Sequence, residues 1–435
     1  MYKQKYMKYK NKYVSLLSLL SYNDKIHNSI TYIPNIIFDE NFNSQNNNED
    51  FKTTKKLTDM NYKNRLLIYN NLHEKINNKD DCSGKNEFLG KGGHSIIYKK
   101  KIPHSDIPVE ISIKEQKVND MIISNKFNNK FKIWLEYDIL KKSTDLILNG
   151  ITQNLPMIYD LYICNDNSKL LFYNELADGS FLDWCLEEHT DDEWKSFIFQ
   201  FWVGVYTLQK YLKLVHNDLR LGNVLFHKIK KTDEYWKYTI DDIEYYIPNE
   251  GYVFVIWDFG SSNLIDIQPI NKTKLDLNID LHFFHDLFNR LRVLYLLDNF
   301  SISELETFFT SDKDLQYTKE KKSECSKRFG HTRYEEKYKI ALIYYLIENN
   351  KFDELKSKYI SNKKNKSIKL PSGNIMKLLK ELSDNNYNYD DVIKIISNPK
   401  SNIRGNKKIV SPNKLIQKYF SEYREKKNYS LKFNI

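Results

Sequence analysis

Two short polar motifs, each bordered by apolar residues, limit what this chain can fold into more than any other feature of its sequence. The first, VHNDLRLGNVLF at 215–226, sets Asp218 five residues before Asn223. The second, VIWDFG at 255–260, contains Asp258. The apolar flanks predict strands, so both motifs lie at strand ends, where loops can present polar groups to a cleft.

The residue types in these motifs suit the transfer of a phosphoryl group from ATP. This reaction needs a carboxylate that orients and deprotonates an attacking hydroxyl. It also needs oxygen ligands for Mg²⁺, which carboxylates and amides supply. The two motifs together therefore predict a site for phosphoryl-transfer chemistry.

A glycine-rich stretch precedes these motifs. FLGKGGHSIIYKK at 88–100 places Gly90, Gly92 and Gly93 at a predicted strand–turn–strand. Glycine lets a backbone come close to phosphates, and a flexible hairpin can fold over a nucleotide. Any hairpin can use glycines, so the pattern alone indicates little.

A lysine and a glutamate follow the hairpin. EISIK at 110–114 ends a predicted strand with Lys114, a cation suited to phosphates, although surface strands often carry lysine. A lysine held in a cleft needs a carboxylate to position it, and Glu136 is the only glutamate between Gln116 and Asn174. The alternative for Glu136 is a solvent-facing position on its helix.

Taken in order, the hairpin, Lys114, Glu136, His216-x-Asp218-x-x-x-x-Asn223 and Asp258-Phe259-Gly260 resemble the signature set of the eukaryotic-type protein kinases. The resemblance covers roughly residues 86–300. It implies an α+β, bilobal fold with a small antiparallel-sheet N-lobe, one main N-lobe helix and a mostly helical C-lobe. It also implies ATP and Mg²⁺ as cofactors and a protein substrate with a Ser or Thr hydroxyl.

The resemblance assigns catalytic and metal-binding roles residue by residue. Asp218 accepts the proton of the substrate hydroxyl, and Lys114 also belongs to the catalytic set. Arg220 stands where these kinases commonly have lysine and offers a forked cation to the transferring phosphoryl group. Asn223 and Asp258 bind Mg²⁺. His216 is expected to support the backbone of the Asp-Phe-Gly motif, with an acid or base role as the alternative.

The resemblance also assigns a nucleotide-binding set. Lys114 contacts the α- and β-phosphates and Glu136 holds it in place. Adenine binds at the hinge near Glu175 to Gly179, mainly through the backbone. The full expected set is Gly90, Lys91, Gly92, Gly93, His94, Ser95, Ile96, Ile97, Tyr98, Lys114, Glu136 and Glu175.

Several residues depart from the kinase pattern. Asn217 replaces the arginine that pairs with a phosphorylated activation loop, so control by such phosphorylation is not expected. Ser95 fills the third glycine position of the hairpin. No Ala-Pro-Glu follows Gly260, and peptide specificity therefore cannot be carried over. Asp280 is expected either to anchor the catalytic loop or to cap the helix that follows it.

Two features are similar to the haspin branch of kinases. One is the sequence DLRLGNVL in the catalytic loop. The other is the alternating strand, turn and strand at 236–260 that leads into Asp258. Haspin-like enzymes also lack Ala-Pro-Glu, but they usually depart from the Asp-Phe-Gly that this chain keeps. The likeness concerns architecture and does not indicate a histone substrate.

The chain is expected to divide into three parts. Residues 1–85 form an N-terminal extension with an amphipathic helix and a polar linker at 41–56, residues 86–178 the N-lobe, and residues 179–435 the C-lobe with a C-terminal helical extension. The amphipathic helix has a short heptad seam and should dock on the kinase itself or on a partner. This seam comprises Tyr2, Tyr6, Tyr9, Tyr13, Leu16 and Leu20.

Hydrophobic periodicity predicts the secondary structure. Strands are expected near 86–92, 95–101, 109–116, 157–164 and 169–175, and helices near 60–77, 125–148, 191–213, 278–297, 333–349, 372–384 and 413–426.

Composition narrows the functional classes further. The net charge of +10 comes from scattered residues without aromatic interleaving, so no clear nucleic-acid site is expected, although an acidic partner is an alternative. The four cysteines form no Cys-x-x-Cys pair, so neither a zinc site nor the disulfide framework of a secreted protein is expected. No apolar run approaches 18 residues. We expect a soluble intracellular protein, cytoplasmic or viral and not secreted, and the Tyr/Lys-rich start resembles proteins of large DNA viruses.

Three functional hypotheses follow. The first is a serine/threonine protein kinase. The second is a small-molecule kinase, because His-Asn-Asp-Leu with Gly-Asn also resembles the choline and aminoglycoside kinases, although GKGGHSIIY with SIK looks more like a protein kinase. The third is a pseudokinase scaffold, which would normally have lost a metal ligand or the lysine. Tyrosine kinase activity has no positive support.

Overall fold

The computed structural model shows an α+β protein. All of the described residues belong to one compact unit, which spans residues 56–435. The expected N-terminal seam and linker lie outside the described residues, as do Gly93, His94 and Asp280. The structure describes residues 60–72, 76, 81–83, 86–92, 95–102, 109–166, 168–264, 283–297, 300–309, 311–316, 318–320, 334–360, 370–384 and 412–435.

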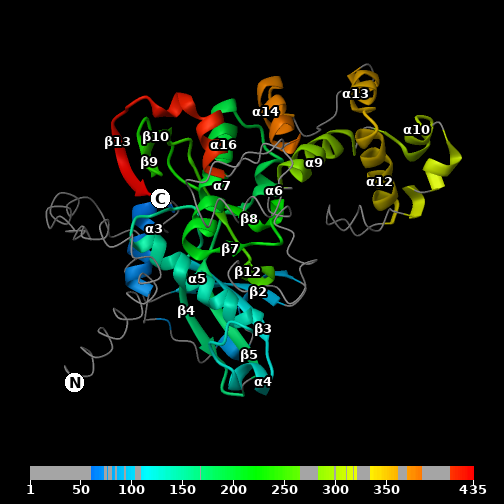
Figure 1. The fold of residues 1–435 in the computed structure, drawn as a ribbon. Coiled ribbons are helices and arrows are strands. Elements are labelled where there is room, and N and C mark those ends of the chain that lie inside the picture. The colour runs from blue at the N-terminus through cyan, green and yellow to red at the C-terminus, as the bar shows by residue number, and fades with distance from the viewer. Residues whose placement is uncertain are drawn as a thin grey trace, which may run out of the picture. The chain divides into compact units, whose positions relative to one another are not determined.

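A five-stranded antiparallel sheet carries the first half of the kinase-like motifs (Figure 1). Its strands lie in the order β1-β2-β3-β5-β4. The bounds are β1 Glu87–Lys91, β2 Ser95–Ile102, β3 Val109–Lys117, β4 Ile158–Ile163 and β5 Lys169–Glu175. Each expected strand of this region is therefore present, because alternating Ile, Val, Leu and Tyr residues favour a pleated, half-buried surface.

The two faces of this sheet pack against different helices. Ile111 of β3 clusters with Ile68 of α3 (Tyr62–Leu72). Phe172 of β5 belongs instead to the main core, together with Ile139 of α5 (Lys132–Leu148). Strand side chains alternate between the faces, so Ser112 and Lys114 point away from the Ile111 face. A short helix, α4 (Asp120–Ser124), precedes α5, and both lie within the expected 125–148 region or just before it.

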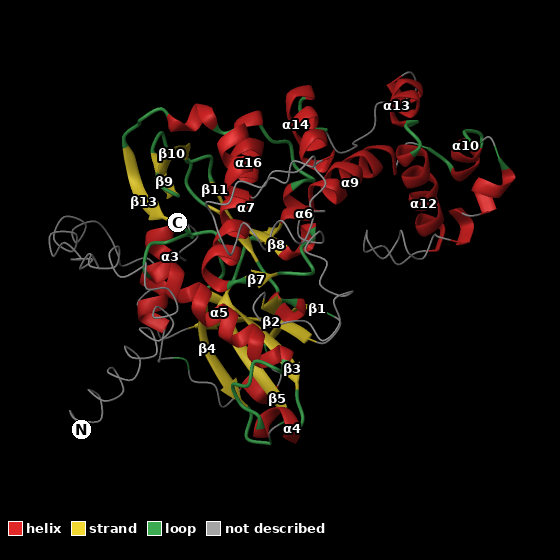
Figure 2. Ribbon diagram, in the orientation of Figure 1, coloured by secondary structure: helices red, strands yellow, loops and turns green. Residues whose placement is uncertain are grey.

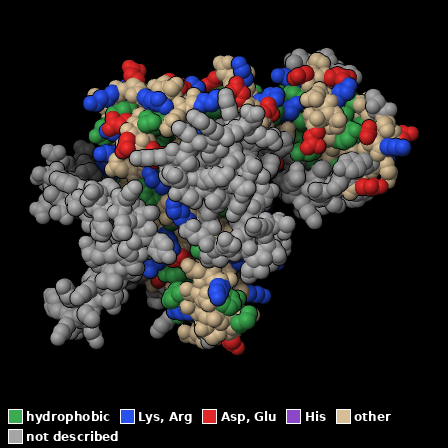
Figure 3. Space-filling view, viewed as in Figure 1, with side chains coloured by type: hydrophobic (Ala, Val, Ile, Leu, Met, Phe, Trp, Pro, Cys, Tyr) green, Lys and Arg blue, Asp and Glu red, His purple; other side chains and the backbone are tan. Residues whose placement is uncertain are grey.

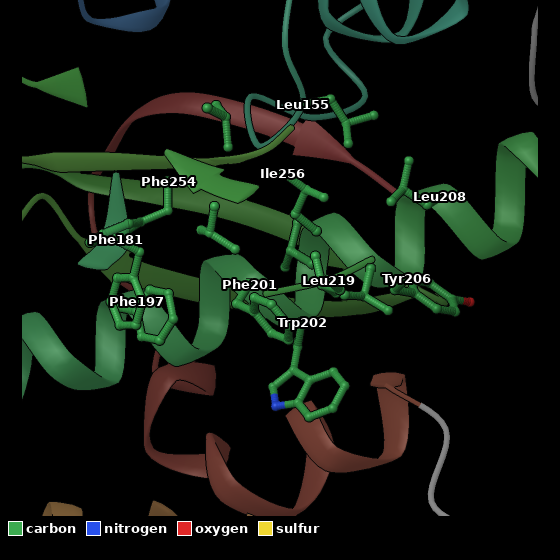
Figure 4. Close-up of a cluster of buried hydrophobic side chains, with 14 of the residues drawn as sticks. Leu155, Phe181, Phe197, Phe201, Trp202, Tyr206, Leu208, Leu219, Phe254 and Ile256 are labelled. Carbon is green, nitrogen blue, oxygen red and sulfur yellow. The ribbon is translucent and has the colours of Figure 1, made fainter. Parts of the chain in front are cut away.

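The main core forms around α7 (Asp191–Leu212), which begins with a capping box between Thr190 and Glu193. Aromatic side chains from α6 (Phe181–Trp184), α7 and β11 (Tyr252–Ile256) meet there, as Figure 4 shows. The rings of Phe181 and Phe197 stack with centroids 3.7 Å apart, and both side chains are fully buried. This core holds β11, and therefore the Asp-Phe-Gly motif that follows it, in place.

Two small sheets carry the catalytic-loop motif. In the first, β11 pairs with β8 (Val224–Lys228), which pairs with β6 (Gly179–Ser180). In the second, β12 (Asn263–Leu264) pairs with β7 (Leu214–Val215). Residues 216–223 therefore connect β7 to β8, and the partners of these two strands, β12 and β11, lie on either side of Asp258 in the sequence.

A further sheet has the order β10-β9-β13 (Figure 2). Its strands β9 (Tyr235–Ile240) and β10 (Ile243–Pro248) form the expected alternating hairpin. Strand β13 (Tyr429–Asn434), which the sequence analysis did not predict, pairs with β9 in parallel. The helix expected at 413–426 is α16 (Pro412–Tyr419), and a short 3₁₀ turn, η4 (Ser421–Arg424), follows it.

The other helices agree with the expected positions where those were given. Helix α3 is shorter than the expected 60–77 stretch, and α10 and α13 were not predicted. The remaining bounds are η1 Asp81–Ser83, η2 Leu221–Asn223, η3 Phe259–Ser261, α9 Phe283–Leu297, α10 Ile302–Glu306, α12 Tyr334–Glu348, α13 Phe352–Ile360 and α14 Gly373–Asp384.

One disulfide, between Cys82 and Cys164, was not foreseen by the cysteine argument. The two residues are 82 positions apart in sequence, but their Cα atoms lie 5.9 Å apart, within the range that a disulfide spans. Asp81 accepts hydrogen bonds from Lys100 (2.5 Å) and from the Tyr173 hydroxyl (2.9 Å), which holds η1 against the sheet. Sequence spacing alone could not reveal this proximity.

The described surface carries both signs of charge. On the face drawn in Figure 3, Lys and Arg side chains are interspersed with Asp and Glu side chains. Within the described part of the chain, no helix combines the length and the apolar character that a membrane crossing demands.

The aromatic core yields a stability prediction. Phe197→Ala removes a fully buried ring from the stack with Phe181, so we expect the free energy of unfolding to fall by about 3–5 kcal/mol. Urea denaturation monitored by circular dichroism measures this change. Leu186→Ala is the matched control, because Leu186 is 52% exposed and its truncation should cost less than about 0.5 kcal/mol. Equal losses in the two variants would contradict the packing described here.

Candidate phosphotransfer site

Lys114 lies between two carboxylates that come from distant parts of the chain. Its Nζ is 2.5 Å from Glu136 Oε1 on α5 and 2.9 Å from Asp258 Oδ1 after β11. Gln116, two residues further along β3, donates from Nε2 to Glu136 Oε2 at 3.0 Å. Lys114 and Glu136 are buried, whereas the Asp258 side chain is 38% exposed and can meet a ligand.

The electrostatics of this cluster favour the charged forms of Lys114 and Asp258. Burial would lower the pKa of Lys114, but Glu136 and Asp258 outweigh it and raise the pKa above its ordinary value. Burial would likewise raise the pKa of Asp258, but the Lys114 ammonium outweighs it and lowers the pKa. The cluster therefore holds a cation and an accessible carboxylate side by side at neutral pH.

The catalytic-loop motif is tied to the strand end that carries Asp258. Asn223 donates from Nδ2 to the backbone oxygen of Asp218 (2.7 Å) and to its carboxylate Oδ2 (3.0 Å). The Trp257 backbone N–H donates to the carbonyl of Asn223 at 2.8 Å. Arg220 Nε lies 3.5 Å from Asp218 Oδ2, and both side chains are partly exposed. The loop thus presents a carboxylate, an amide and a guanidinium beside Asp258.

His216 connects the catalytic loop to the backbone before Asp258. It is fully buried, and its Nε2 donates to the carbonyl of Trp257 at 2.7 Å, because a carbonyl can only accept. Its Nδ1 accepts from the backbone N–H of Asp218 at 3.4 Å. One imidazole therefore joins the backbone before Asp258 to the backbone of Asp218.

The glycine-rich hairpin is formed by β1 and β2. Gly92 N–H donates to the Ser95 carbonyl at 2.8 Å, which closes the turn. Gly90 pairs with Ile97, and Ile97 pairs with Lys114. Residues directly opposite each other in antiparallel strands share a face, so Gly90 and Ile97 lie on the face that carries Lys114. The expected hairpin residues Lys91, Ser95, Ile96 and Tyr98 lie on these strands as well, and Gly93 and His94 lie outside the described residues.

Glu175 does not join this cluster through its side chain. The carboxylate is fully buried and accepts from Arg65 Nε (2.9 Å) and Nη2 (2.8 Å), and from the Met157 backbone N–H (3.0 Å). Burial would raise the pKa of Glu175, but Arg65 and then His227 lower it to about 2. The carboxylate is therefore unavailable to a nucleotide, and the backbone after β5 is the part that could hold one.

Two residues near the site were missed by the sequence analysis. Arg65 precedes Ile68 by three positions and Leu72 by seven, so helical spacing places it on the apolar face of α3, an unusual position for arginine. Lys132, at the start of α5, binds the carbonyl oxygen of Ser262 and, at 2.5 Å, Oδ1 of Asn263. No sequence signal marked Lys132, because first-turn lysines are common on solvent-facing helices.

The donor set fits a magnesium ion. Carboxylate oxygens of Asp258 and the amide oxygen of Asn223 are the hard ligands that Mg²⁺ prefers, with one or two protein ligands and substrate phosphates completing its shell. Among the described residues, no group of three or more His, Cys, Asp or Glu side chains could hold a metal by itself.

Comparison with known proteins finds similarity to viral proteins named as kinases. No protein-family model matches the chain. "Probable serine/threonine-protein kinase 380R" of Invertebrate iridescent virus 6 is 24% identical over 189 residues, which are 40% of this chain and 35% of that protein. Protein 019R of Frog virus 3 (isolate Goorha), named provisionally as a serine/threonine-protein kinase, is 26% identical over 201 residues, or 41% of this chain and 23% of that protein.

These similarities relate part of the chain to proteins of two viruses. The matched segments are similar to proteins named as serine/threonine kinases in large DNA viruses, which agrees with the protein-kinase resemblance of the motifs. The matched segments span about a third of the first relative and less than a quarter of the second.

The Arg65–Glu175 pair yields a pH prediction. Because the pKa of folded Glu175 is lowered from 4.5 to about 2, its contribution to stability is fully present above about pH 4.5 and is lost as the pH falls toward 2. Glu175→Gln should therefore flatten the slope of unfolding free energy against pH over this window. It should also cost about 3–5 kcal/mol at pH 7, because Arg65 is left buried and unpaired.

Urea titrations at a series of pH values measure both effects. Glu425→Gln is the control, because this carboxylate is 74% exposed and its change should leave the slope as in the wild type. A wild-type slope in Glu175→Gln would show that the buried pair does not couple folding to protonation.

Proposed function

We propose that this protein is an ATP- and Mg²⁺-dependent serine/threonine protein kinase that transfers the γ-phosphoryl group of ATP to a protein hydroxyl. The observation that carries the proposal is the position of Lys114 between Glu136 and Asp258, with Asp218 and Asn223 tied to the same strand end. The relatives named as serine/threonine kinases support the choice of class. In this proposal the five-stranded sheet with α5 is the N-lobe of a bilobal enzyme, and the helical part is the C-lobe.

Each residue of the cluster has a distinct role in the proposal. Lys114 neutralises the α- and β-phosphates, and Glu136 keeps its ammonium oriented. Asp218 accepts the proton of the attacking hydroxyl, and its hydrogen bond from Asn223 fixes the carboxylate. Arg220, with 61% of its side chain exposed, offers a second cation to the transferring phosphoryl group. The hairpin of β1 and β2 covers the phosphates, and the backbone from Glu175 to Gly179 holds adenine.

Asn223 and Asp258 would hold Mg²⁺, which neutralises the charge of the β- and γ-phosphates when it is bound. Positioning and charge neutralisation contribute most to phosphoryl transfer, and general-base help typically adds about 10²–10⁴-fold. Removal of Lys114 or Asp258 should therefore harm turnover about as much as removal of Asp218.

The decisive experiment follows the γ-phosphoryl group of radiolabelled ATP. We expect label on protein Ser or Thr residues; label on metabolites alone would indicate a small-molecule kinase. Nucleotide binding without transfer of label would indicate a pseudokinase. These outcomes separate the three hypotheses in one assay.

Asp218→Asn tests the assigned base. We expect turnover to fall by about 10²–10⁴-fold while ATP affinity stays within about threefold, because the amide keeps the shape of the side chain but cannot accept a proton. Initial rates and equilibrium nucleotide binding measure the two quantities. Asp312→Asn, an exposed aspartate outside the cluster, is the control. Wild-type turnover in Asp218→Asn would remove this residue from the mechanism.

The contacts after the Asp-Phe-Gly motif support activity without phosphorylation. Lys132 binds the Ser262 carbonyl and Asn263, and Asn217 donates from Nδ2 to the Ser261 carbonyl at 3.3 Å. These side chains of α5 and of the catalytic loop hold residues 261–263 through direct hydrogen bonds.

A phosphatase experiment checks this consequence. Enzyme treated with a broad-specificity phosphatase should keep its activity within about twofold, whereas Lys132→Met should lose about tenfold, because the segment after Asp258 loses its cation. Lys195→Met, a lysine on α7, is the matched control. Inactivation by the phosphatase would show that a phosphate group orders the segment.

A further inference from the structure

Among the residues that the structure describes, Arg65 is the most deeply buried cation outside the proposed catalytic cluster. Its side chain is fully buried, and its N–H groups make four hydrogen bonds. Two go to Glu175 at the end of β5. The others go to the carbonyl oxygens of Gln153 (Nη1, 2.6 Å) and Leu155 (Nη2, 2.7 Å) in the segment between α5 and β4.

The segment held by Arg65 continues to the strand that carries Asp258. Asn154 donates from Nδ2 to the Phe254 carbonyl at 2.9 Å, and its own carbonyl accepts from the Ile256 N–H at 3.2 Å. Asp258 follows Ile256 by two residues. One polar network therefore runs from α3 through Gln153–Leu155 to β11, and through Glu175 to the end of β5.

This network contacts two segments that lead into the proposed site. The end of β5 leads into the backbone proposed to hold adenine, and β11 leads into the proposed metal ligand. Ser112 Oγ, two residues before Lys114 on β3, donates to the Glu175 carbonyl at 2.9 Å. The position of Glu175 is thus linked to β3, β5 and the segment before β4, and Arg65 supplies the charge that keeps the carboxylate there.

Stability alone does not explain why an ion pair is buried at this position. A buried pair loses much of its Coulombic gain to desolvation, and apolar residues of similar volume often stabilise a core equally well. An arginine fork, however, fixes the geometry of a carboxylate and of carbonyl groups far more strictly than apolar packing does. Geometry is what a phosphoryl-transfer site requires, because a small displacement of reacting groups lowers the rate steeply.

We propose that Arg65 is a positioning residue of this site, which fixes the end of β5 relative to β11 through Glu175 and the Gln153–Leu155 segment. The inference rests on the proposed function for its kinetic consequence but not for its structural one. If Arg65 has this role, then α3 contributes to catalysis although it precedes all of the kinase-like motifs in the sequence.

The kinetic consequence is selective. Loss of the fork should loosen the adenine-binding backbone while Asp218, Asn223 and Lys114 keep their own contacts. We therefore expect Arg65→Met to raise KM for ATP about tenfold and to change kcat less than about threefold. A loss of folded protein alone would lower the apparent kcat at an unchanged KM.

The structural consequence is measured by hydrogen exchange with mass spectrometry on the full chain. Peptides that cover 153–158, 172–177 and 252–258 should exchange faster in Arg65→Met than in the wild type, because the network joins these segments. Arg65→Lys keeps the charge without the fork, and we expect an intermediate result in both measurements. Leu67→Ala is the control, because Leu67 lies on the same helix and is 38% exposed. This variant should match the wild type.

The outcomes separate the two proposals. Faster exchange in all three segments together with the KM effect supports both. Faster exchange in a protein whose wild type transfers no phosphate supports the positioning network and overturns the proposed function. Unchanged exchange and KM in folded Arg65→Met, or in Arg65→Lys if the Met variant does not fold, overturns the role of Arg65.

Discussion

A buried ammonium group that needs two carboxylates is the constraint on which the rest of this structure depends. Lys114 is almost inaccessible to water, and an unpaired cation there would be costly. Its partners lie on α5 and after β11, so the sheet, the helix and the strand end must converge on one point. The core around Phe197 and the backbone contacts of His216 serve this convergence, since they fix where β11 ends.

Much of the fold and of the candidate site could be predicted because its signals are local. Strand alternation and helical periodicity act over a few residues, and the scarcity of glutamate singled out Glu136. The rest depends on contacts between distant segments, which leave no local pattern. The Cys82–Cys164 pair, the parallel strand β13 and the Arg65–Glu175 pair are all of this kind. Glu175 was expected to contact adenine mainly through its backbone, and its carboxylate binds Arg65, a partner that the sequence did not indicate.

The segment between α5 and β4 unites elements that the motifs treat separately. Thr152, Gln153, Asn154 and Leu155 are fully buried although three of them are polar, and their hydrogen bonds reach α3, β9 and β11. Tyr62 of α3 also packs edge-on against Phe433 of β13, with ring centroids 5.1 Å apart. Segments outside the kinase-like motifs therefore complete the packing around residues 152–155.

Strand β13 has a consequence for how the chain must be made. It adds to β9 from a position roughly 190 residues further along the sequence, and it does so in parallel. While a ribosome is still producing the intervening helices, the outer edge of β9 has no neighbour and its amide and carbonyl groups can attract foreign strands. A chaperone or slow release from the ribosome would protect this edge of β9 until β13 pairs with it.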